Sequence, residues 1–432
     1  MSAATISLLI LLLALILFVT EKIPLAATAI LVDVLLVYTG VLPAEEAFSG
    51  FSDPTVILFG ATFVIGAALF QTGVAKLIGD TVIRAAGTSE TRLIVVIMLV
   101  TGFLSSVLSN TGTAAVLLPI IMAIAASARL SNKRLLMPLA YAAGLGGMIS
   151  LVGTPPNIIA KATLESANYP SFGFFEYGLV GVPMLIVGVL YMVFIGRKIL
   201  PADKATLQAD AIEAASQQLA SEGLSQKKGR KSSKFHMWTS AIVLLVTVTV
   251  MAWGEFPLEV VAVTGAITVV ITGCLKLEQA FRAIDWTTIF LFAGMLPMAD
   301  ALDKTGAGKV IADAVISLMG DDPSPYLIVA VLFIVSSGLS NFMSNTATAA
   351  LLCPIGLAIA KGLGADPRAV VLTIAIAASC VFMTPVGTPP NTLVLGPAGY
   401  RFMDYVKTGW PLTLISLVLA VIFIPFFWPF FP

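Results

Sequence analysis

Apolar stretches about as long as a bilayer is thick recur along this chain from end to end. A helix needs about 20 mainly apolar residues to cross the hydrocarbon core, and such stretches run from the first ten residues to the last ten. Of the 432 residues, 58% are hydrophobic and only 11% are charged, and the charged residues lie mostly between the apolar stretches. The sequence therefore predicts an all-α polytopic membrane protein.

The sequence also repeats itself at an offset of 233 to 235 residues, which indicates a duplicated unit. The matching pairs are Pro24 with Pro257, Gly40 with Gly273, Thr72-Gly73 with Thr305-Gly306, Ser109-Asn110-Thr111 with Ser344-Asn345-Thr346, and the G-T-P-P-N element from Gly153 with that from Gly387. We expect one repeat over residues 1–200 and a second over 237–432. The polar segment 201–236 between them, which ends in a basic cluster, is predicted to be a cytoplasmic linker.

Each repeat is expected to contain three spanning helices, an apolar stretch broken at S-N-T, a helix broken at G-T-P-P-N, and a final span. The expected ranges in the first repeat are roughly 5–20, 23–41, 53–72, 92–128, 134–166 and 178–199. In the second repeat they are roughly 237–253, 257–275, 285–302, 325–363, 369–400 and 410–430. If the S-N-T stretch is a re-entrant hairpin, each repeat has five crossings, and this odd number inverts the second copy.

The basic residues agree with this topology. When the linker is placed inside, five crossings per repeat put the N- and C-termini outside, and 19 of the 24 Lys and Arg residues then lie on the inner side. Such an asymmetry is what the positive-inside rule predicts. The two hairpins would enter from opposite faces, the first from the cytoplasm and the second from outside.

The broken segments are the predicted binding site. Irregular backbone survives at membrane depth only where protein or trapped water surrounds it. Ser, Asn and Thr cap helices, and their oxygens can also face a ligand. The prolines of G-T-P-P-N remove backbone donors, so the helix must unwind there. Carbonyls freed by unwinding can coordinate a hard cation, and the N-termini of the resuming half-helices favour an anion.

Through these motifs, S-N-T-G-T from Ser109, S-N-T-A-T from Ser344 and the two G-T-P-P-N elements, the sequence resembles the divalent anion:sodium symporters of the ion transporter superfamily. The resemblance covers nearly the whole chain. It implies inverted repeats, opposed hairpins, a homodimer held by scaffold helices, and a transport domain that moves like an elevator. It implies substrate contacts from Ser109, Asn110, Thr111, Ser344, Asn345 and Thr346, helped by Thr154, Pro155, Thr388 and Pro389.

The same resemblance implies two sodium clamps. One would be formed by Ser105, Ser109, Asn110 and Gly153, and the other by Ser340, Met343, Asn345 and Gly387. Ser105 and Ser340 each lie one helical turn before S-N-T, on the same face. Because no Arg or Lys lies inside either broken region, bound sodium would supply the charge that a buried carboxylate needs.

The expected function is therefore sodium-coupled symport of small anions across the cell (inner) membrane, with C4-dicarboxylates such as succinate, malate and fumarate as substrates. Sodium is the expected coupling ion, and no cofactor is expected. A sulfate or citrate carrier would use the same motifs. An arsenite exporter or a sodium/proton antiporter of the same superfamily is a further alternative, since proton coupling needs a buried acid such as Asp33. The repeat, however, places Ala266 opposite Asp33.

Functions of other classes are not expected. The single histidine, His236, lies in the predicted linker, no D-D-x-x-D or H-E-x-x-H cluster is present, and no cysteine has a neighbouring base, so the chain is not expected to be an enzyme. The net charge is zero, so no basic surface indicates a nucleic acid partner. A channel is disfavoured, because paired closed hairpins fit alternating access better.

Overall fold

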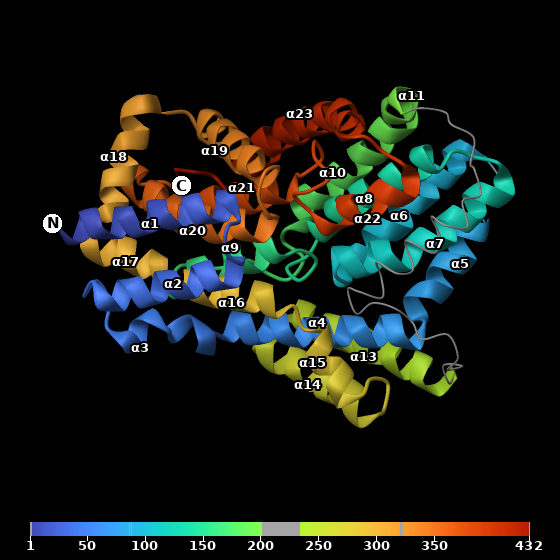
Figure 1. Ribbon diagram of the computed structural model, residues 1–432, viewed down its shortest axis with the longest axis horizontal. Coiled ribbons are helices and arrows are strands. Elements are labelled where there is room, and N and C mark those ends of the chain that lie inside the picture. The colour runs from blue at the N-terminus through green and yellow to red at the C-terminus, as the bar shows by residue number, and fades with distance from the viewer. Residues whose placement is uncertain (1, 86, 88, 201–233, 320–322, 432) are drawn as a thin grey trace.

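The computed structural model describes residues 2–85, 87, 89–200, 234–319 and 323–431, and within these residues the chain forms helices and loops but no strand. Eight helices in the described part are long and apolar enough to cross a membrane, and four shorter apolar helices accompany them. The predicted all-α polytopic fold is confirmed (Figure 1). The predicted linker falls largely on residues 201–233, outside the described residues, and α13 begins at Lys234, slightly before the expected start at 237.

The first half contains the helices α1 (Ala3–Thr20), α2 (Leu25–Tyr38), α3 (Ala44–Ala47), α4 (Pro54–Thr72), α5 (Val74–Ala85), α6 (Glu90–Val107), α7 (Asn110–Ala128), α8 (Asn132–Gly147), α9 (Pro155–Ser166), α10 (Gly178–Tyr191) and α11 (Arg197–Ile199), with the 3-10 turn η1 (Ser49–Ser52) and the π-helical turn η2 (Met192–Gly196). The second half contains α13 (Lys234–Trp253), α14 (Leu258–Ile271), α15 (Leu277–Ala283), α16 (Trp286–Met295), α17 (Pro297–Thr305), α18 (Ala307–Met319), α19 (Pro325–Ser340), α20 (Asn345–Leu363), α21 (Pro367–Ser379), α22 (Pro389–Ala398) and α23 (Phe402–Phe427).

Residues that match between the two halves adopt the same local structure. The paired glycines that follow helices are left-handed in both copies, as their φ angles show: Gly40 (71°) with Gly273 (75°), and Gly73 (85°) with Gly306 (74°). Only glycine adopts this region without strain. Asp53 and Asp285 each cap the next helix through a backbone N–H two or three residues on. The sequence repeat is therefore also a repeat of helix ends.

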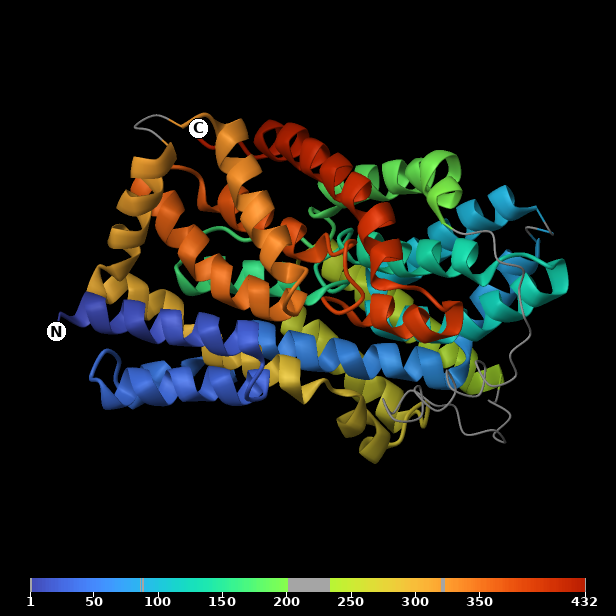
Figure 2. The same ribbon diagram turned by 45° about the horizontal axis from the view of Figure 1, so that its top comes forward.

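The opening helices of the two halves pack across each other. α2 packs against α16 and α17, α1 packs against α17, and α4 packs against α13 and α14. Figure 1 shows these groups with the broken helices α8, α9, α21 and α22 beside them, and Figure 2 shows the start of α1 and the C-terminal end on the same side of the molecule. Which membrane face that side occupies stays a prediction.

Two features of the fold differ from the expected spans. α5 and α18 are additional amphipathic helices that start directly after Gly73 and Gly306. Their charged residues lower the average hydropathy, so a search for apolar stretches passes over them, although their apolar residues recur at helical spacing. The expected span 285–302 is interrupted at Leu296 between α16 and α17, because Pro297 has no N–H to continue the helix.

Candidate functional site

Both predicted interruptions are present. α8 ends at Gly147 and α9 begins at Pro155, while α21 ends at Ser379 and α22 begins at Pro389. In each case the first proline of G-T-P-P-N is the first helical residue, a position where its missing N–H costs nothing. The two breaks lie in the middle of the bundle (Figure 1).

The S-N-T elements form the tips of two helix pairs, α6–α7 and α19–α20. Ser109 Oγ accepts a hydrogen bond from Gly112 N (3.2 Å), and Ser344 Oγ accepts one from Ala347 N (3.1 Å), so both serines cap the second helix of their pair. The next residues, Asn110 and Asn345, are each only 8% exposed. Each hairpin tip therefore places a buried amide beside a helix N-terminus.

Oxygen atoms converge at the first tip. Ser105 Oγ lies 2.6 Å from the Asn110 side chain and 2.8 Å from the carbonyl oxygen of Ala143. When the amide nitrogen of Asn110 points toward Ser105, it donates to the carbonyls of Ala143 (2.9 Å) and Gly153 (3.0 Å). When the amide oxygen points there instead, it faces the Ser105 hydroxyl and these two carbonyl oxygens. Oxygen atoms are the ligands that a hard cation prefers. Ser105, Asn110 and Gly153 of the first predicted clamp are thus together.

Glycines allow the broken chain to approach this tip. A Cβ added to Gly147 would lie 2.4 Å from Asn110 Oδ1, and one added to Gly153 would lie 2.5 Å from the carbonyl oxygen of Gly147. Both distances are far below van der Waals contact, so a larger residue at Gly147 would move the Asn110 amide, and one at Gly153 would push the broken chain away at Gly147.

The second tip has a related but different arrangement. Ser340 Oγ donates to the carbonyl of Ala378 (2.6 Å), which matches the Ser105 contact with Ala143. A Cβ on Gly387 would lie 2.3 Å from the carbonyl oxygen of Ser340, so these two predicted clamp residues touch. In the described part of the chain, no hydrogen bond joins Asn345 to either of them; its Oδ1 accepts from Thr346 Oγ1 at 3.3 Å.

The other predicted residues differ in burial. Met343 and Thr346 are buried, as are Thr154 and Thr388. The Thr154 hydroxyl has no hydrogen-bond partner among the residues that the structure describes. Four more of the predicted residues are half-buried, namely Ser109, Thr111, Pro155 and Ser344, whereas Pro389 is exposed.

Two asparagines that the sequence analysis did not select hold the breaks in shape. Asn157 Nδ2 donates to the carbonyl of Ser150 (2.8 Å), and Asn391 Nδ2 donates to the carbonyls of Val381 (2.9 Å) and Thr384 (2.8 Å). These bonds satisfy carbonyls that the unwound chain leaves without helical partners. The Oδ1 atoms of both asparagines are buried, and no described residue donates a hydrogen bond to them.

A tyrosine and a glycine at the start of α10 and of α23 support the break of each half. Tyr177 OH donates to the carbonyl of Asn157 (2.7 Å), and Tyr405 OH donates to that of Asn391 (2.6 Å). Four residues further on, a Cβ on Gly181 or Gly409 would lie 2.4 or 2.1 Å from a carbonyl oxygen of the break. The repeated Tyr-x3-Gly spacing is visible in the sequence and could have identified these positions.

The two breaks meet inside the bundle. Cys380 Sγ lies 3.9 Å from Met148 Sδ, and Tyr141 OH donates to the carbonyl of Phe382 (2.8 Å). In addition, α7 packs against α22, and α20 packs against α9. The second leg of each hairpin therefore packs on the broken helix of the other half.

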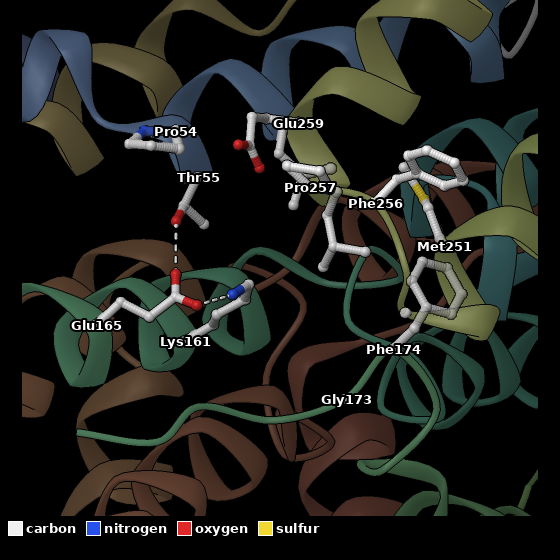
Figure 3. A pocket seen from close by; sticks show the side chains of 13 residues that line it. Pro54, Thr55, Lys161, Glu165, Gly173, Phe174, Met251, Phe256, Pro257 and Glu259 are labelled. Atoms are coloured by element: carbon white, nitrogen blue, oxygen red, sulfur yellow. Dashed lines mark hydrogen bonds and ion pairs between the residues drawn. The ribbon is translucent and has the colours of Figure 1, made fainter. Parts of the chain in front are cut away.

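A separate cavity of about 420 Å³ lies between α9 and the α4 and α13–α14 region. Figure 3 shows Glu165 facing Thr55 across this space, where Thr55 Oγ1 donates to Glu165 Oε2 at 3.4 Å and Lys161 pairs with the same carboxylate. Burial raises the pKa of Asp53 at the start of α4, and hydrogen bonds from Thr55 oppose that rise. None of the predicted substrate or sodium residues lines this cavity.

Comparisons with known proteins agree with this architecture. A family model described as a citrate transporter matches residues 15–375 and 342–431. A sodium-dependent dicarboxylate transporter, SdcS, of Staphylococcus aureus is 28% identical over 452 residues, which cover 95% of this chain and 84% of that protein. A transporter of Haemophilus influenzae is 31% identical over 424 residues, which cover 96% and 89% of the two chains.

Two solved structures share the fold. The YdaH transporter of Alcanivorax borkumensis superposes with a TM-score of 0.61 at 14% identity, covering 99% of both chains. MtrF of Neisseria gonorrhoeae superposes with a TM-score of 0.62 at 11% identity, covering 99% of this chain and 95% of that one. The predicted resemblance is confirmed, and the chain is a multi-pass membrane transporter and not an enzyme. It belongs to the citrate transporter family, within the ion transporter superfamily that also includes the divalent anion:sodium symporters.

Proposed function

We propose that this chain is a sodium-coupled symporter of small anions that works by alternating access, with C4-dicarboxylates as its substrates. The observation that supports this most strongly is the group of oxygens from Ser105, Asn110, Ala143 and Gly153 at the first hairpin tip. The names of the SdcS relatives, sodium-dependent dicarboxylate transporters, point to the same substrate class and ion.

The charge of the substrate explains why its transport would be coupled to sodium. The two tips and the two breaks contain no Lys or Arg, and an isolated carboxylate buried at membrane depth is strongly unfavourable. Helix N-termini at Asn110, Asn345, Pro155 and Pro389 offer about half a positive charge each. Sodium bound at the Ser105–Asn110 cluster supplies a whole charge and orders the tip before the anion arrives.

The coupling would be electrogenic if more sodium charge than substrate charge crosses the membrane. Each net charge then gains about 2.3 kcal/mol per 100 mV of membrane potential. The inside-negative potential of a cell membrane would therefore drive import, which suits a scarce dicarboxylate.

The packing suggests which parts move. Helices α6–α9 and α19–α22 would form the transport domain, while α1, α2, α4, α13, α14 and α16 would form the scaffold of a homodimer. α5 and α18 connect the two groups along the chain. The repeats 1–200 and 237–432 would be inverted, with both termini outside the cell membrane and the linker in the cytoplasm.

Citrate is the second candidate substrate, because the matching family model describes a citrate transporter. Citrate has a third carboxylate that succinate lacks, and that group would need its own partners in the site. The affinities of succinate and citrate, measured by competition for one binding site, therefore separate the two candidates.

The test is uptake of labelled succinate by purified protein in liposomes, with an inward gradient of sodium or of choline. We expect concentrative, saturable uptake with sodium that ends when choline replaces it. Uptake that continues unchanged in choline would contradict the coupling. Thermal stabilisation by succinate, malate, citrate, sulfate and arsenite, each with and without sodium, identifies the substrate class, since a ligand that binds the folded state raises the melting temperature.

A further inference from the structure

Asp33 is a fully buried carboxyl group. It is 0% exposed, and among the described residues neither of its side-chain oxygens has a hydrogen-bond partner. It is the single charged residue of α2 (Leu25–Tyr38). Buried carboxyl oxygens are almost always paired in folded proteins, so this exception needs a physical reason.

Within the part of the chain that the structure describes, the helices packed on α2 bring no unpaired cation to Asp33. α1 (Ala3–Thr20) and α16 (Trp286–Met295) contain no charged residue. The titratable residues of the other two contacting helices, α3 and α17, are Glu45, Glu46, Asp300, Asp303 and Lys304. The Lys304 ammonium is paired with Glu46, and Asp303 is paired with Lys361.

The contact between α2 and α16 is close. A Cβ on Gly294 would lie 3.0 Å from the Cβ and the carbonyl carbon of Ala29. Asp33 lies one helical turn beyond Ala29 on the same face of α2, and Val32 and Leu36 beside it are also buried. The carboxyl therefore sits on a buried face of α2 that also carries Ala29, Val32 and Leu36, and it is shielded from solvent.

We propose that Asp33 is an intramembrane proton-binding site, whose carboxyl keeps its proton at neutral pH and packs between α2 and α16 as a neutral group. An ionised carboxylate without a partner is strongly unfavourable in such surroundings. Proton release leaves one carboxylate and one free proton, and no other group is changed. Asp33 is not one of the duplicated residues from which the proposed sodium site is built, because the repeat places Ala266 at the matching position.

Proton binding at Asp33 makes the fold pH-dependent in a definite direction. In the unfolded chain an Asp side chain is ionised above about pH 4. The folded chain then binds one proton more than the unfolded chain at neutral pH, so stability falls as the pH rises. This fall ends only where the folded protein also loses the proton.

The experiment compares the wild type with Asp33→Asn, which keeps the shape of the side chain but cannot ionise, and with Asp313→Asn on α18, where the aspartate is exposed. Melting temperatures are measured from acidic to alkaline pH, with and without sodium. We expect Asp33→Asn to melt a few degrees above the wild type at neutral and alkaline pH and close to it at acidic pH, while Asp313→Asn follows the wild type. Parallel melting curves for Asp33→Asn and the wild type would overturn the proposal. So would a sodium stabilisation that disappears in Asp33→Asn, because it would assign a metal cation to this carboxyl.

An infrared measurement needs no variant. Wild-type protein labelled with ¹³C at the aspartate carboxyls should show the C=O stretch of a protonated carboxyl at neutral pH, and this band should shift slowly in D₂O because Asp33 is shielded from solvent. If Asp33→Asn folds, the band should be missing from its spectrum. Absence of the band in the wild type would refute the proposal even if Asp33→Asn does not fold.

Discussion

Replacing Ser105 with alanine tests the sodium cluster most directly. Its hydroxyl is completely buried and makes two short contacts, 2.6 Å to Asn110 and 2.8 Å to the carbonyl oxygen of Ala143. Removing one partner of a buried hydrogen bond costs about 1–3 kcal/mol, which corresponds to about 5- to 150-fold in a binding constant. If Ser105 Oγ is a sodium ligand, Ser105→Ala should raise the sodium dissociation constant by a factor in this range.

The neighbouring serine is a matched control. Ser106 is also buried, but its hydroxyl donates to the carbonyl of Phe103 (2.7 Å) within its own helix. Ser106→Ala should therefore keep the sodium dependence of the wild type. The assay is thermal stabilisation as a function of sodium concentration, followed by the sodium dependence of succinate uptake. The reasoning fails if Ser105→Ala binds sodium like the wild type, or if Ser106→Ala weakens sodium binding as strongly.

Three further predictions follow from the breaks and their supports. Asn157→Ala and Asn391→Ala should each lose about 1–3 kcal/mol of stability, because the carbonyls of Ser150, Val381 and Thr384 lose their amide donors; unchanged melting temperatures would show that these bonds do not hold the breaks. Gly181→Ala and Gly409→Ala should reduce the yield of folded protein, whereas Gly66→Ala, with nothing within 4 Å of its added Cβ, should not; size-exclusion profiles of the three variants compare them, and equal profiles would contradict the close packing. Cysteines that replace Thr55 and Glu165, in a variant without the three native cysteines, should allow a cross-link between α4 and α9. This cross-link should stop uptake until it is reduced. Uptake that persists after complete cross-linking would contradict movement of α9 relative to α4.

The positions of the breaks were predictable from the sequence because they follow from local chemistry. Proline cannot continue a hydrogen-bonded helix, and serine before asparagine caps a new one. These rules place the starts of α7, α9, α20 and α22 at the motifs where the structure has them. The duplicated spacing then indicated that the motifs belong together, since one proline pair alone is commonly only a kink.

The supports of the breaks could not be derived in the same way. The Asn157 amide donates a hydrogen bond to the Ser150 carbonyl, and the Tyr177 hydroxyl donates one to the Asn157 carbonyl. Both contacts depend on how the start of α10 packs on the break. Likewise, Ser105 hydrogen-bonds to both Asn110 and Ala143, but in the described structure Ser340 hydrogen-bonds to Ala378 and not to Asn345. The sequence motifs of the two tips are nearly identical, so their difference arises from packing, in part because Val381 stands where the first half has Gly147.

Asp33 shows the same difference between what the sequence determines and what the packing determines. Its position within an apolar stretch, and the absence of a repeat partner, are evident from the residues alone. A side chain at that position could still face water, a cation or another helix. In the structure α2 packs closely on α16, where Gly294 approaches Ala29, and the described residues give the Asp33 carboxyl no hydrogen-bond partner. Local sequence decides where a helix can start and stop, because capping and proline effects act within a few residues, whereas the partners of a buried polar group are set by the packing of helices distant in the chain.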